Sequence, residues 1–247
     1  MICTYGPDPD QYAELHRPEG DQLGVAVVIH GGFWRAAYDA SLGRELARDL
    51  AQRGWTTYNI EYRRVGKGGG WPTTLQDVSD AVDLLSELDL DLSRVVAIGH
   101  SAGGHLAAWA AGRSGLPSSA PGSSPRVSLT GIVSQAGVLD LRTGAARSVG
   151  GSAIPDLLGG SPDEVPERYD WADPIARVPL PVPVVCVHSH ADESVPFAQS
   201  ADYVAAARAA GGSVELVEFD GDHMAHVDPS SKAWAAVVAA LPRFLHP

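Results

Sequence analysis

The sequence predicts an α/β fold in which a mostly parallel sheet is covered by helices on both faces. Short apolar, β-branched runs alternate along the chain with longer amphipathic segments, which is typical of parallel sheets. The length of 247 residues fits one large domain covering 1–247. With 45% hydrophobic and 19% charged residues, the chain has the composition of a globular protein with an ordinary core.

The N-terminal part begins with two predicted strands and a helix. An alternating segment at 11–17 predicts an antiparallel edge strand, and the run Val-Ala-Val-Val-Ile at 25–29 predicts the first buried strand. Residues 55–60 are the next predicted strand. Between them, leucines at every fourth position predict a helix that ends near Gly54: Leu42, Leu46 and Leu50.

The middle of the chain continues the pattern. Thr73 and Gln76 have capping-box spacing and predict the start of an amphipathic helix. Residues 95–98 lack alternation and predict a buried strand, which leads directly into a helix of small residues. The Gly-, Pro- and Ser-rich segment 112–126 predicts a surface loop.

The C-terminal part contains the remaining strands and an insert. The insert at 137–180 is rich in Pro, Gly and Trp, and the capping-box spacing of Ser161 and Glu164 predicts short helices and turns. It is too small for an independent domain and is placed to act as a partial lid. Strands are predicted at 131–135, 184–188 and 214–219, with a helix opened by Pro196 and a final helix carrying Trp234.

The charge balance restricts the expected partners. The formal net charge is −12, from 18 basic and 30 acidic residues. Nucleic acids and anionic membranes require clustered Lys and Arg, so neither is expected as a partner. We expect a small-molecule ester or amide substrate instead, and the assembly is left open between a monomer and a homodimer.

Location and redox state follow from local composition. No stretch approaches the roughly 20 apolar residues needed to cross a bilayer, and the first residues lack a secretory signal pattern. We therefore expect a cytoplasmic protein. Two cysteines cannot build a disulfide framework, and Cys186 is predicted to be a small core residue.

A nucleophile motif lies at residues 99–103, Gly-His-Ser-Ala-Gly. It matches G-x-S-x-G, in which a serine occupies a strained turn between a strand and a helix. The turn is so tight that its flanking positions must be small, and Gly99 and Gly103 satisfy this. The motif follows a predicted buried strand, so Ser101 is predicted to be a catalytic nucleophile. The N–H of Ala102, at the helix N-terminus, is a predicted oxyanion-hole donor.

A second glycine-rich turn supplies the other predicted half of the oxyanion hole. His30-Gly31-Gly32-Phe33-Trp34 follows the strand at 25–29, and paired glycines let a backbone N–H approach a ligand. The sequence leaves open whether Gly32 or Phe33 donates. His30, with His100 and His105 near the nucleophile, is interpreted as holding loops through hydrogen bonds.

An acid and a base must follow in the order Ser, acid, His. Asp192 and Glu193 both follow the strand at 184–188 and can both hold an imidazole there. Asp192 is favoured, and Glu193 is interpreted as a carboxylate in the first turn of the next helix, where the helix dipole stabilises it. His223 and His226 both follow the strand at 214–219, and His223 is favoured as the general base.

The alternative to this triad is a metal site. Several His and Asp residues follow the last two strands, and such side chains suit divalent ions. No H-E-x-x-H or C-x-x-C pattern accompanies them. The sequence therefore predicts no metal site.

Taken together, these motifs resemble the α/β-hydrolase superfamily over nearly the whole chain. H-G-G-F-W at 30–34 and G-H-S-A-G-G-H at 99–105 are similar to the kynurenine (aryl) formamidase group and to small bacterial carboxylesterases. The motif Gly-Asp-His at 221–223, which Asp228-Pro229 follows, is also similar to that group and favours His223 as the base. The short H-G-G-x-W form departs from the H-G-G-G of lipase-like esterases. The resemblance implies a Ser101–His223–Asp192 triad without a cofactor, and it does not fix the substrate.

The expected function is therefore that of a serine hydrolase, a carboxylesterase or arylformamidase, cleaving esters or small aryl amides. Trp34, Trp71 and Trp171 are predicted to bind substrate, since aromatic rings commonly line apolar pockets. Met224, next to His223 in the chain, is also predicted to bind substrate. Two alternatives are kept. The Asp-Glu-Ser-Val-Pro segment at 192–196 suggests a small exopeptidase of the prolyl-oligopeptidase type, and a non-catalytic binding protein on this fold is the other.

Overall fold

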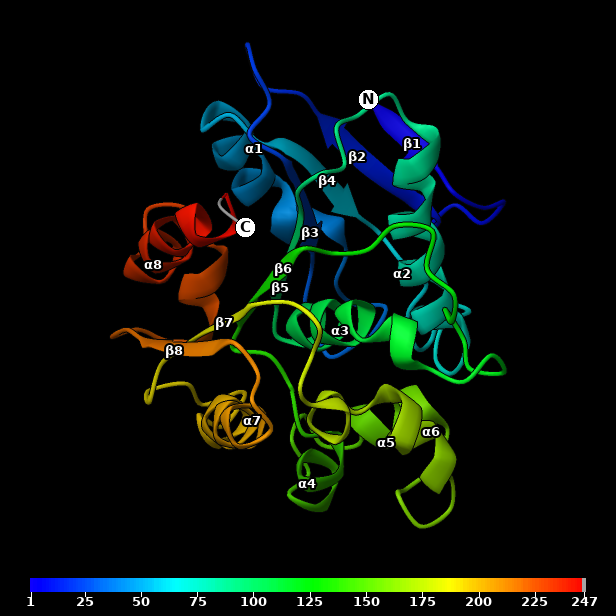
Figure 1. The fold of residues 1–247 in the computed structure, drawn as a ribbon. Helices are drawn as coiled ribbons and strands as arrows, with labels where there is room; N and C mark the ends of the chain where they lie inside the picture. The colour runs from blue at the N-terminus through cyan, green and yellow to red at the C-terminus, as the bar shows by residue number, and fades with distance from the viewer. Residues whose placement is uncertain (246–247) are drawn as a thin grey trace.

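The computed structural model describes residues 1–245 and contains an eight-stranded sheet (Figure 1). The strand order is β1-β2-β4-β3-β5-β6-β7-β8, and the last six strands in that order run parallel. This confirms the predicted fold class. The strands are β1 (Ile2–Thr4), β2 (Tyr12–His16), β3 (Val25–Ile29), β4 (Thr56–Ile60), β5 (Val95–His100), β6 (Gly131–Gln135), β7 (Val184–His188) and β8 (Val214–Glu218).

Helices cover both faces of the sheet because its central strands are apolar on both sides. In β3, Val25, Val27 and Ile29 belong to one core cluster, and the intervening Ala26 and Val28 belong to the other. One face is covered by α1 (Arg44–Gln52) and α8 (Lys232–Ala240). The other is covered by α2 (Thr73–Leu84), α3 (Ala102–Ala111) and α7 (Ala198–Ala209).

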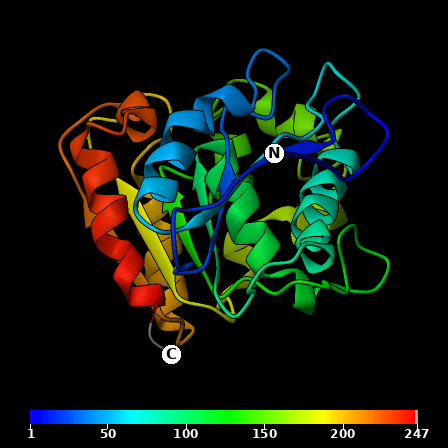
Figure 2. The same ribbon diagram turned by 90° about the horizontal axis from the view of Figure 1, so that it is seen from above.

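The helices α1 and α8 lie side by side although they are distant in sequence (Figures 1 and 2). The indole Nε1 of Trp234 in α8 donates to Asp49 Oδ2 in α1 at 2.7 Å. Trp234 is almost fully buried and joins Leu46 and Leu50 of α1 in one apolar cluster. Leu46 and Leu50 therefore lie on the buried face of α1, as predicted, whereas Leu42 precedes the helix in a short 3₁₀ turn, Ala40–Gly43.

Two local predictions were wrong. The segment at 11–17 forms an antiparallel strand, but it is not at the edge, because β1 pairs with β2 on its outer side. The capping box of Thr73 and Gln76 does not form: Pro72 is the N-cap of α2, without a side-chain cap. Gln76 instead donates to Asp80 one turn further along α2, at 2.8 Å.

The insert at 137–180 forms three short helices, as predicted, and they group beyond α3 (Figure 1). These are α4 (Leu141–Ala146), α5 (Ala153–Leu158) and α6 (Pro166–Ala172). The predicted box at Ser161 is present: its N–H donates to Glu164 Oε2 at 2.8 Å, and the Glu164 N–H donates back to its hydroxyl at 3.4 Å. This pair closes the turn that precedes α6 rather than opening the helix itself.

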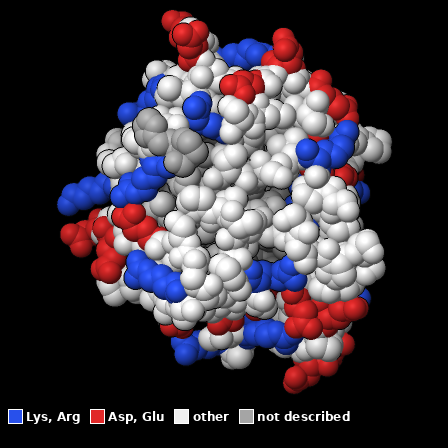
Figure 3. All heavy atoms as spheres, viewed as in Figure 1, with Lys and Arg blue, Asp and Glu red and all other residues white. Residues whose placement is uncertain are grey.

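One face of the molecule shows how its charged side chains are distributed. On the face drawn in Figure 3, basic and acidic side chains are interspersed around the margin, and the middle is mostly uncharged. Among residues 1–245, no helix is both long and apolar enough to cross a membrane.

Candidate active site

Ser101 lies in a sharp turn between β5 and α3. Its backbone has φ 55° and ψ −119°, a left-handed conformation that is costly for a residue with a side chain. The two flanking glycines make the turn sterically feasible. A Cβ on Gly99 would overlap the backbone of Gly103, and a Cβ on Gly103 would overlap the carbonyl of Ile29 in β3.

The second element of the site is a hydrogen-bonded acid and imidazole. Asp192 follows β7 and His223 follows β8, and Asp192 Oδ2 accepts from His223 Nδ1 at 2.6 Å. The other candidates are not brought together in this way. Glu193 is exposed, and His226 is fully buried with neither ring nitrogen hydrogen-bonded to any described residue.

The carboxylate of Asp192 is saturated with donors. Its Oδ1 accepts the N–H groups of Ser194 and Val195, each at 2.8 Å. Its Oδ2 is 3.3 Å from Nε2 of His188, which also donates to the Val195 carbonyl at 3.0 Å. Burial alone raises the pKa of Asp192, but hydrogen bonds from His188, His223 and the Val195 amide outweigh it and hold the pKa well below its ordinary range. Asp192 therefore stays ionised at neutral pH.

Ser101 and His223 line the same pocket. Within the described chain, the Ser101 hydroxyl has no hydrogen-bond partner, so the contact with His223 is not closed in this conformation. Catalytic hydrogen bonds are often long before substrate binds. The cavity volume is about 90 Å³. Its lining residues are Gly32, Phe33, Tyr38, Leu42, His100, Ser101, Ser194, His223 and Met224.

The glycine-rich turn after β3 lies against the nucleophile. A Cβ on Gly31 would lie 3.0 Å from the Cβ of Ser101, so this backbone approaches the serine closely. Gly32 and Phe33 both have positive φ, 109° and 52°, and both line the pocket. Ala102 is the first residue of α3, where backbone N–H groups lack partners within the helix. Of the three predicted oxyanion-hole residues, Gly32 and Phe33 thus share the pocket of Ser101, and Ala102 follows the serine directly in the chain.

Two other histidines support the turns of the site. His100 Nε2 donates to the backbone carbonyl of His223 at 3.0 Å, which ties the base loop to the nucleophile turn. Burial, reinforced by His223, lowers the pKa of His100 to about 3. His105 Nε2 donates to the Ala172 carbonyl at 2.9 Å and joins α3 to α6. These contacts agree with the loop-holding role expected for both.

The assignment of Trp34 to substrate binding is wrong. Trp34 is fully buried and lines no part of the Ser101 pocket. Its ring packs edge-on against His105, with centroids 5.2 Å apart. The backbone at Trp34 is left-handed, with φ 56°, and the side chain belongs to the core cluster that contains α3. Met224, by contrast, lines the pocket and is 48% exposed.

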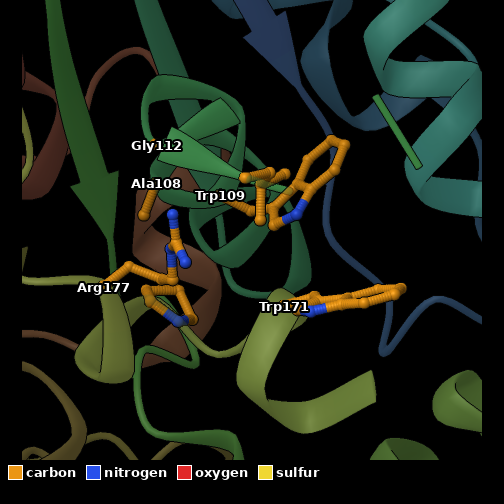
Figure 4. Close-up of a pocket in the computed structure, with 7 residues that line it drawn as sticks. Ala108, Trp109, Gly112, Trp171 and Arg177 are labelled. Atoms are coloured by element: carbon orange, nitrogen blue, oxygen red, sulfur yellow. The ribbon is translucent and has the colours of Figure 1, made fainter. Parts of the chain in front are cut away.

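Trp71 and Trp171 come together, but away from Ser101. Their ring centroids are 6.0 Å apart, and both line a groove of about 440 Å³ that shares no lining residue with the Ser101 pocket. Trp171 also borders a narrow crevice at the C-terminal end of α3, beside Trp109 (Figure 4). Ser101 lies at the opposite end of α3. A helix of 10 residues is about 15 Å long, so these rings are not part of the nucleophile's pocket.

Sequence reasoning missed three residues that line this pocket: Tyr38, Leu42 and Ser194. Tyr38 is 44% exposed, and a Cβ on Gly32 would overlap it, so its ring forms a wall beside the glycine-rich turn. The available signal was an aromatic residue a few positions after the Gly-Gly pair. No residue of 137–180 lines the pocket itself, but the predicted partial lid packs against one of its walls, because a Cβ on Gly150 would lie 2.4 Å from the ring of Phe33.

The described residues offer little support for a metal centre. Among residues 1–245, no group of three or more His, Cys, Asp and Glu side chains is arranged to hold a metal ion. The histidines around Asp192 make hydrogen bonds to protein atoms or lie buried without partners.

Together, the sheet order and the serine turn define an α/β-hydrolase fold. Three solved structures share it at TM-scores of 0.77 to 0.83 and identities of 20–22%. They are a truncated carbohydrate esterase from gut microbiota (99% of this chain, 95% of that one), a thermophilic esterase of Thermogutta terrifontis with butyrate bound (99% and 92%), and esterase B from Lactobacillus rhamnosis (98% and 83%).

More narrowly, the chain belongs to the BD-FAE family, whose profile matches residues 14–206. Among curated proteins it is 27% identical to a probable isoprenylcysteine alpha-carbonyl methylesterase of Oryza sativa, over 88% of this chain and 56% of that protein. It is 28% identical to esterase LipQ of Mycobacterium tuberculosis, over 83% and 51%. The chain thus spans about half the length of these relatives. None of them is an arylformamidase, so that part of the resemblance stays a prediction.

Proposed function

We propose that this protein is a serine carboxylesterase that cleaves esters of small acyl groups. One observation carries the proposal: Ser101 occupies a left-handed strand-to-helix turn and shares a pocket with His223, whose ring is bound to the ionised Asp192. The names of the relatives, which are esterases, support the same class of reaction.

In the proposed reaction, His223 takes the Ser101 proton through Nε2 while the hydroxyl oxygen attacks the ester carbonyl. Asp192 accepts from Nδ1, which leaves Nε2 free to act as the base and stabilises the imidazolium that forms. The imidazolium then protonates the departing alcohol. A water molecule, activated by the same imidazole, releases the acid from the acyl-enzyme.

The negative charge on the carbonyl oxygen needs donors that are already in place. The N–H of Ala102 and one from Gly32 or Phe33 are the proposed pair. Each such donor stabilises the transition state by about 2.7–4 kcal/mol.

The size of the pocket favours a short acyl chain. Its volume of about 90 Å³ is small, and its walls are largely apolar: Phe33, Tyr38, Leu42 and Met224. The Thermogutta terrifontis esterase, which has the same fold, has been solved with propionate and with butyrate bound. We therefore expect acetyl to butyryl esters to be turned over faster than octanoyl esters.

The test is a rate panel for the wild type and Ser101→Ala. The panel contains p-nitrophenyl acetate to octanoate, N-formylkynurenine and aminoacyl-p-nitroanilides. We expect ester cleavage, a preference for short chains, and a loss of several orders of magnitude in kcat for the variant with an unchanged fold. Faster cleavage of the formamide would identify an arylformamidase, and faster cleavage of the anilides an exopeptidase. Failure of a fluorophosphonate probe to label the wild type would favour a binding protein.

A further inference from the structure

We propose that Gly150, in the insert at 137–180, is a specificity-determining position for the acyl group. Its missing side chain leaves room for the ring of Phe33, which forms a wall of the Ser101 pocket. The inference rests on the proposed function, since it concerns the substrate of the same serine. It assigns the upper limit on acyl length to a contact between the insert and the glycine-rich turn after β3.

Phe33 lies in a tight turn whose backbone determines where its ring points. The N–H of Arg35 donates to the Gly32 carbonyl at 3.0 Å. The two residues between them, Phe33 and Trp34, have φ 52° and 56°. Two successive left-handed residues are typical of a type I′ turn, and this conformation is costly for residues with side chains. The surrounding structure must therefore hold the turn.

Contacts on both sides hold this turn. On the core side, the ring of Trp34 is fully buried and packs edge-on against His105 of α3, with centroids 5.2 Å apart. On the other side, the guanidinium of Arg35 reaches the insert. Its Nη2 donates to the Gly150 carbonyl at 3.2 Å and to the Ser152 hydroxyl at 3.3 Å. The insert is therefore one of the supports of the turn that carries Phe33.

The ring of Phe33 itself contacts the insert at Gly150. A Cβ on Gly150 would lie 2.4 Å from Cδ1 and 2.5 Å from Cε1 of the ring, well inside the contact distance of two carbon atoms. Only a glycine lets the ring pack against this backbone. Gly150 does not line the Ser101 pocket, whereas Phe33 does, so the ring stands between the insert and the cavity.

The backbone of the insert is fixed next to this contact. The Val149 N–H donates to the Gly144 carbonyl in α4 at 2.9 Å, and the Val149 side chain is buried in the core. The Gly151 N–H closes a turn onto the Ser148 carbonyl at 2.8 Å. A side chain at position 150 would therefore displace the aromatic ring rather than the insert.

This displacement would reduce the space for the substrate. Two carbon atoms in contact are about 3.5–4.0 Å apart, so a methyl group on Gly150 would push the Phe33 ring by about 1 Å or more toward the cavity that it borders. The cavity of about 90 Å³ has little volume to lose. One methylene group in an apolar pocket changes kcat/KM by about 10–200-fold. Gly150 therefore sets how long an acyl chain fits.

The test is the ratio of kcat/KM for p-nitrophenyl butyrate to kcat/KM for p-nitrophenyl acetate in Gly150→Ala. We expect this ratio to fall by about ten-fold or more relative to the wild type, while acetate is still hydrolysed. The matched control is Gly151→Ala. Gly151 has φ 70° and Gly150 has φ 67°, but a Cβ on Gly151 would meet nothing within 4 Å. The control carries the same backbone strain without the contact, so its ratio should equal that of the wild type.

Two variants of Phe33 test the contact from its other side. Phe33→Ala removes the ring and should shift the preference the other way, toward butyrate and hexanoate. In Phe33→Ala/Gly150→Ala the second substitution should not change the ratio further, because no ring remains to be displaced. If Gly150→Ala alone does not fold, the combined variant should fold, because the overlap is gone. Failure of both beside a folded Gly151→Ala would overturn the inference.

The remaining outcomes separate this inference from the proposed function. An unchanged ratio in folded Gly150→Ala, an equal fall in Gly151→Ala, or no shift toward longer chains in Phe33→Ala would overturn the inference alone. A wild type that hydrolyses no ester, or an active Ser101→Ala, would instead refute the proposed function.

Discussion

The substitution Asp192→Asn replaces one carboxylate oxygen of the proposed site by an NH₂ group, removes its negative charge and so tests its electrostatics. The Oδ1 position already accepts the N–H groups of Ser194 and Val195, so the asparagine oxygen will occupy it. The amide NH₂ must then replace Oδ2. That position is 2.6 Å from Nδ1 of His223 and 3.3 Å from Nε2 of His188.

The NH₂ group would face two ring nitrogens that donate in the wild type. His223 can avoid this clash of donors by moving its hydrogen from Nδ1 to Nε2. In that tautomer Nε2 can no longer accept the Ser101 proton. We therefore expect kcat to fall by about 10⁴-fold, as for the same exchange in a serine protease, while the backbone around Asp192 is retained.

Stability should respond as well. The folded-state pKa of Asp192 lies below its unfolded value, so its contribution is present above about pH 4 and is lost as the pH falls through the folded pKa. At pH 7 the asparagine variant should lose about 1.5–3 kcal/mol in the free energy of unfolding, the size of one hydrogen bond to a charged group.

The assay is the steady-state hydrolysis of p-nitrophenyl acetate, with urea unfolding at pH 7 for stability. Glu193→Gln is the matched control, because Glu193 is an exposed carboxylate next in sequence, and it should leave both quantities unchanged. A kcat for Asp192→Asn within ten-fold of the wild type would refute the assignment of the acid.

Three further predictions concern the frame around the site. In Gly103→Ala the added Cβ would overlap the Ile29 carbonyl. This overpacking should destabilise the protein by about 1–3 kcal/mol and abolish fluorophosphonate labelling of Ser101, so normal labelling would contradict the prediction. Trp34→Phe should lower the melting temperature and leave the acyl-chain preference unchanged, because the ring is buried in the core. An altered preference would show that Trp34 contacts the substrate. Burial lowers the pKa of His105 to about 4. Its contribution to the free energy of unfolding is therefore full above about pH 6.5 and is lost as the pH falls toward 4. Urea unfolding between pH 4 and 8 should show a smaller pH dependence for His105→Gln than for the wild type.

Much of the site was accessible from sequence because its constraints are local. The strained turn at Ser101 requires small neighbours within a few positions, and Gly99 and Gly103 show this directly. The order of strands along the chain then limits where an acid and a base can follow, which led to Asp192 and His223. The structure brings these two side chains into contact at 2.6 Å.

What the sequence could not show is where a side chain points once distant segments pack. The sequence predicts the same substrate-binding role for three tryptophans, Trp34, Trp71 and Trp171. Trp34 is in fact buried in the core, and the other two line a separate groove. The contact between His30 in the glycine-rich turn and Glu61 could not be predicted either, because Glu61 lies 31 positions away and belongs to no recognisable motif. Such contacts depend on which strands become neighbours, here β3 and β4.

Trapping the acyl-enzyme shows most directly whether the Ser101 hydroxyl attacks the substrate. Wild-type protein is mixed with p-nitrophenyl acetate, quenched in acid within the first turnover, and digested for mass spectrometry. The account predicts one acetyl group per chain on the peptide that contains Ser101, formed together with a burst of p-nitrophenol. Acetylation at a different residue, or full turnover by Ser101→Ala, would contradict it.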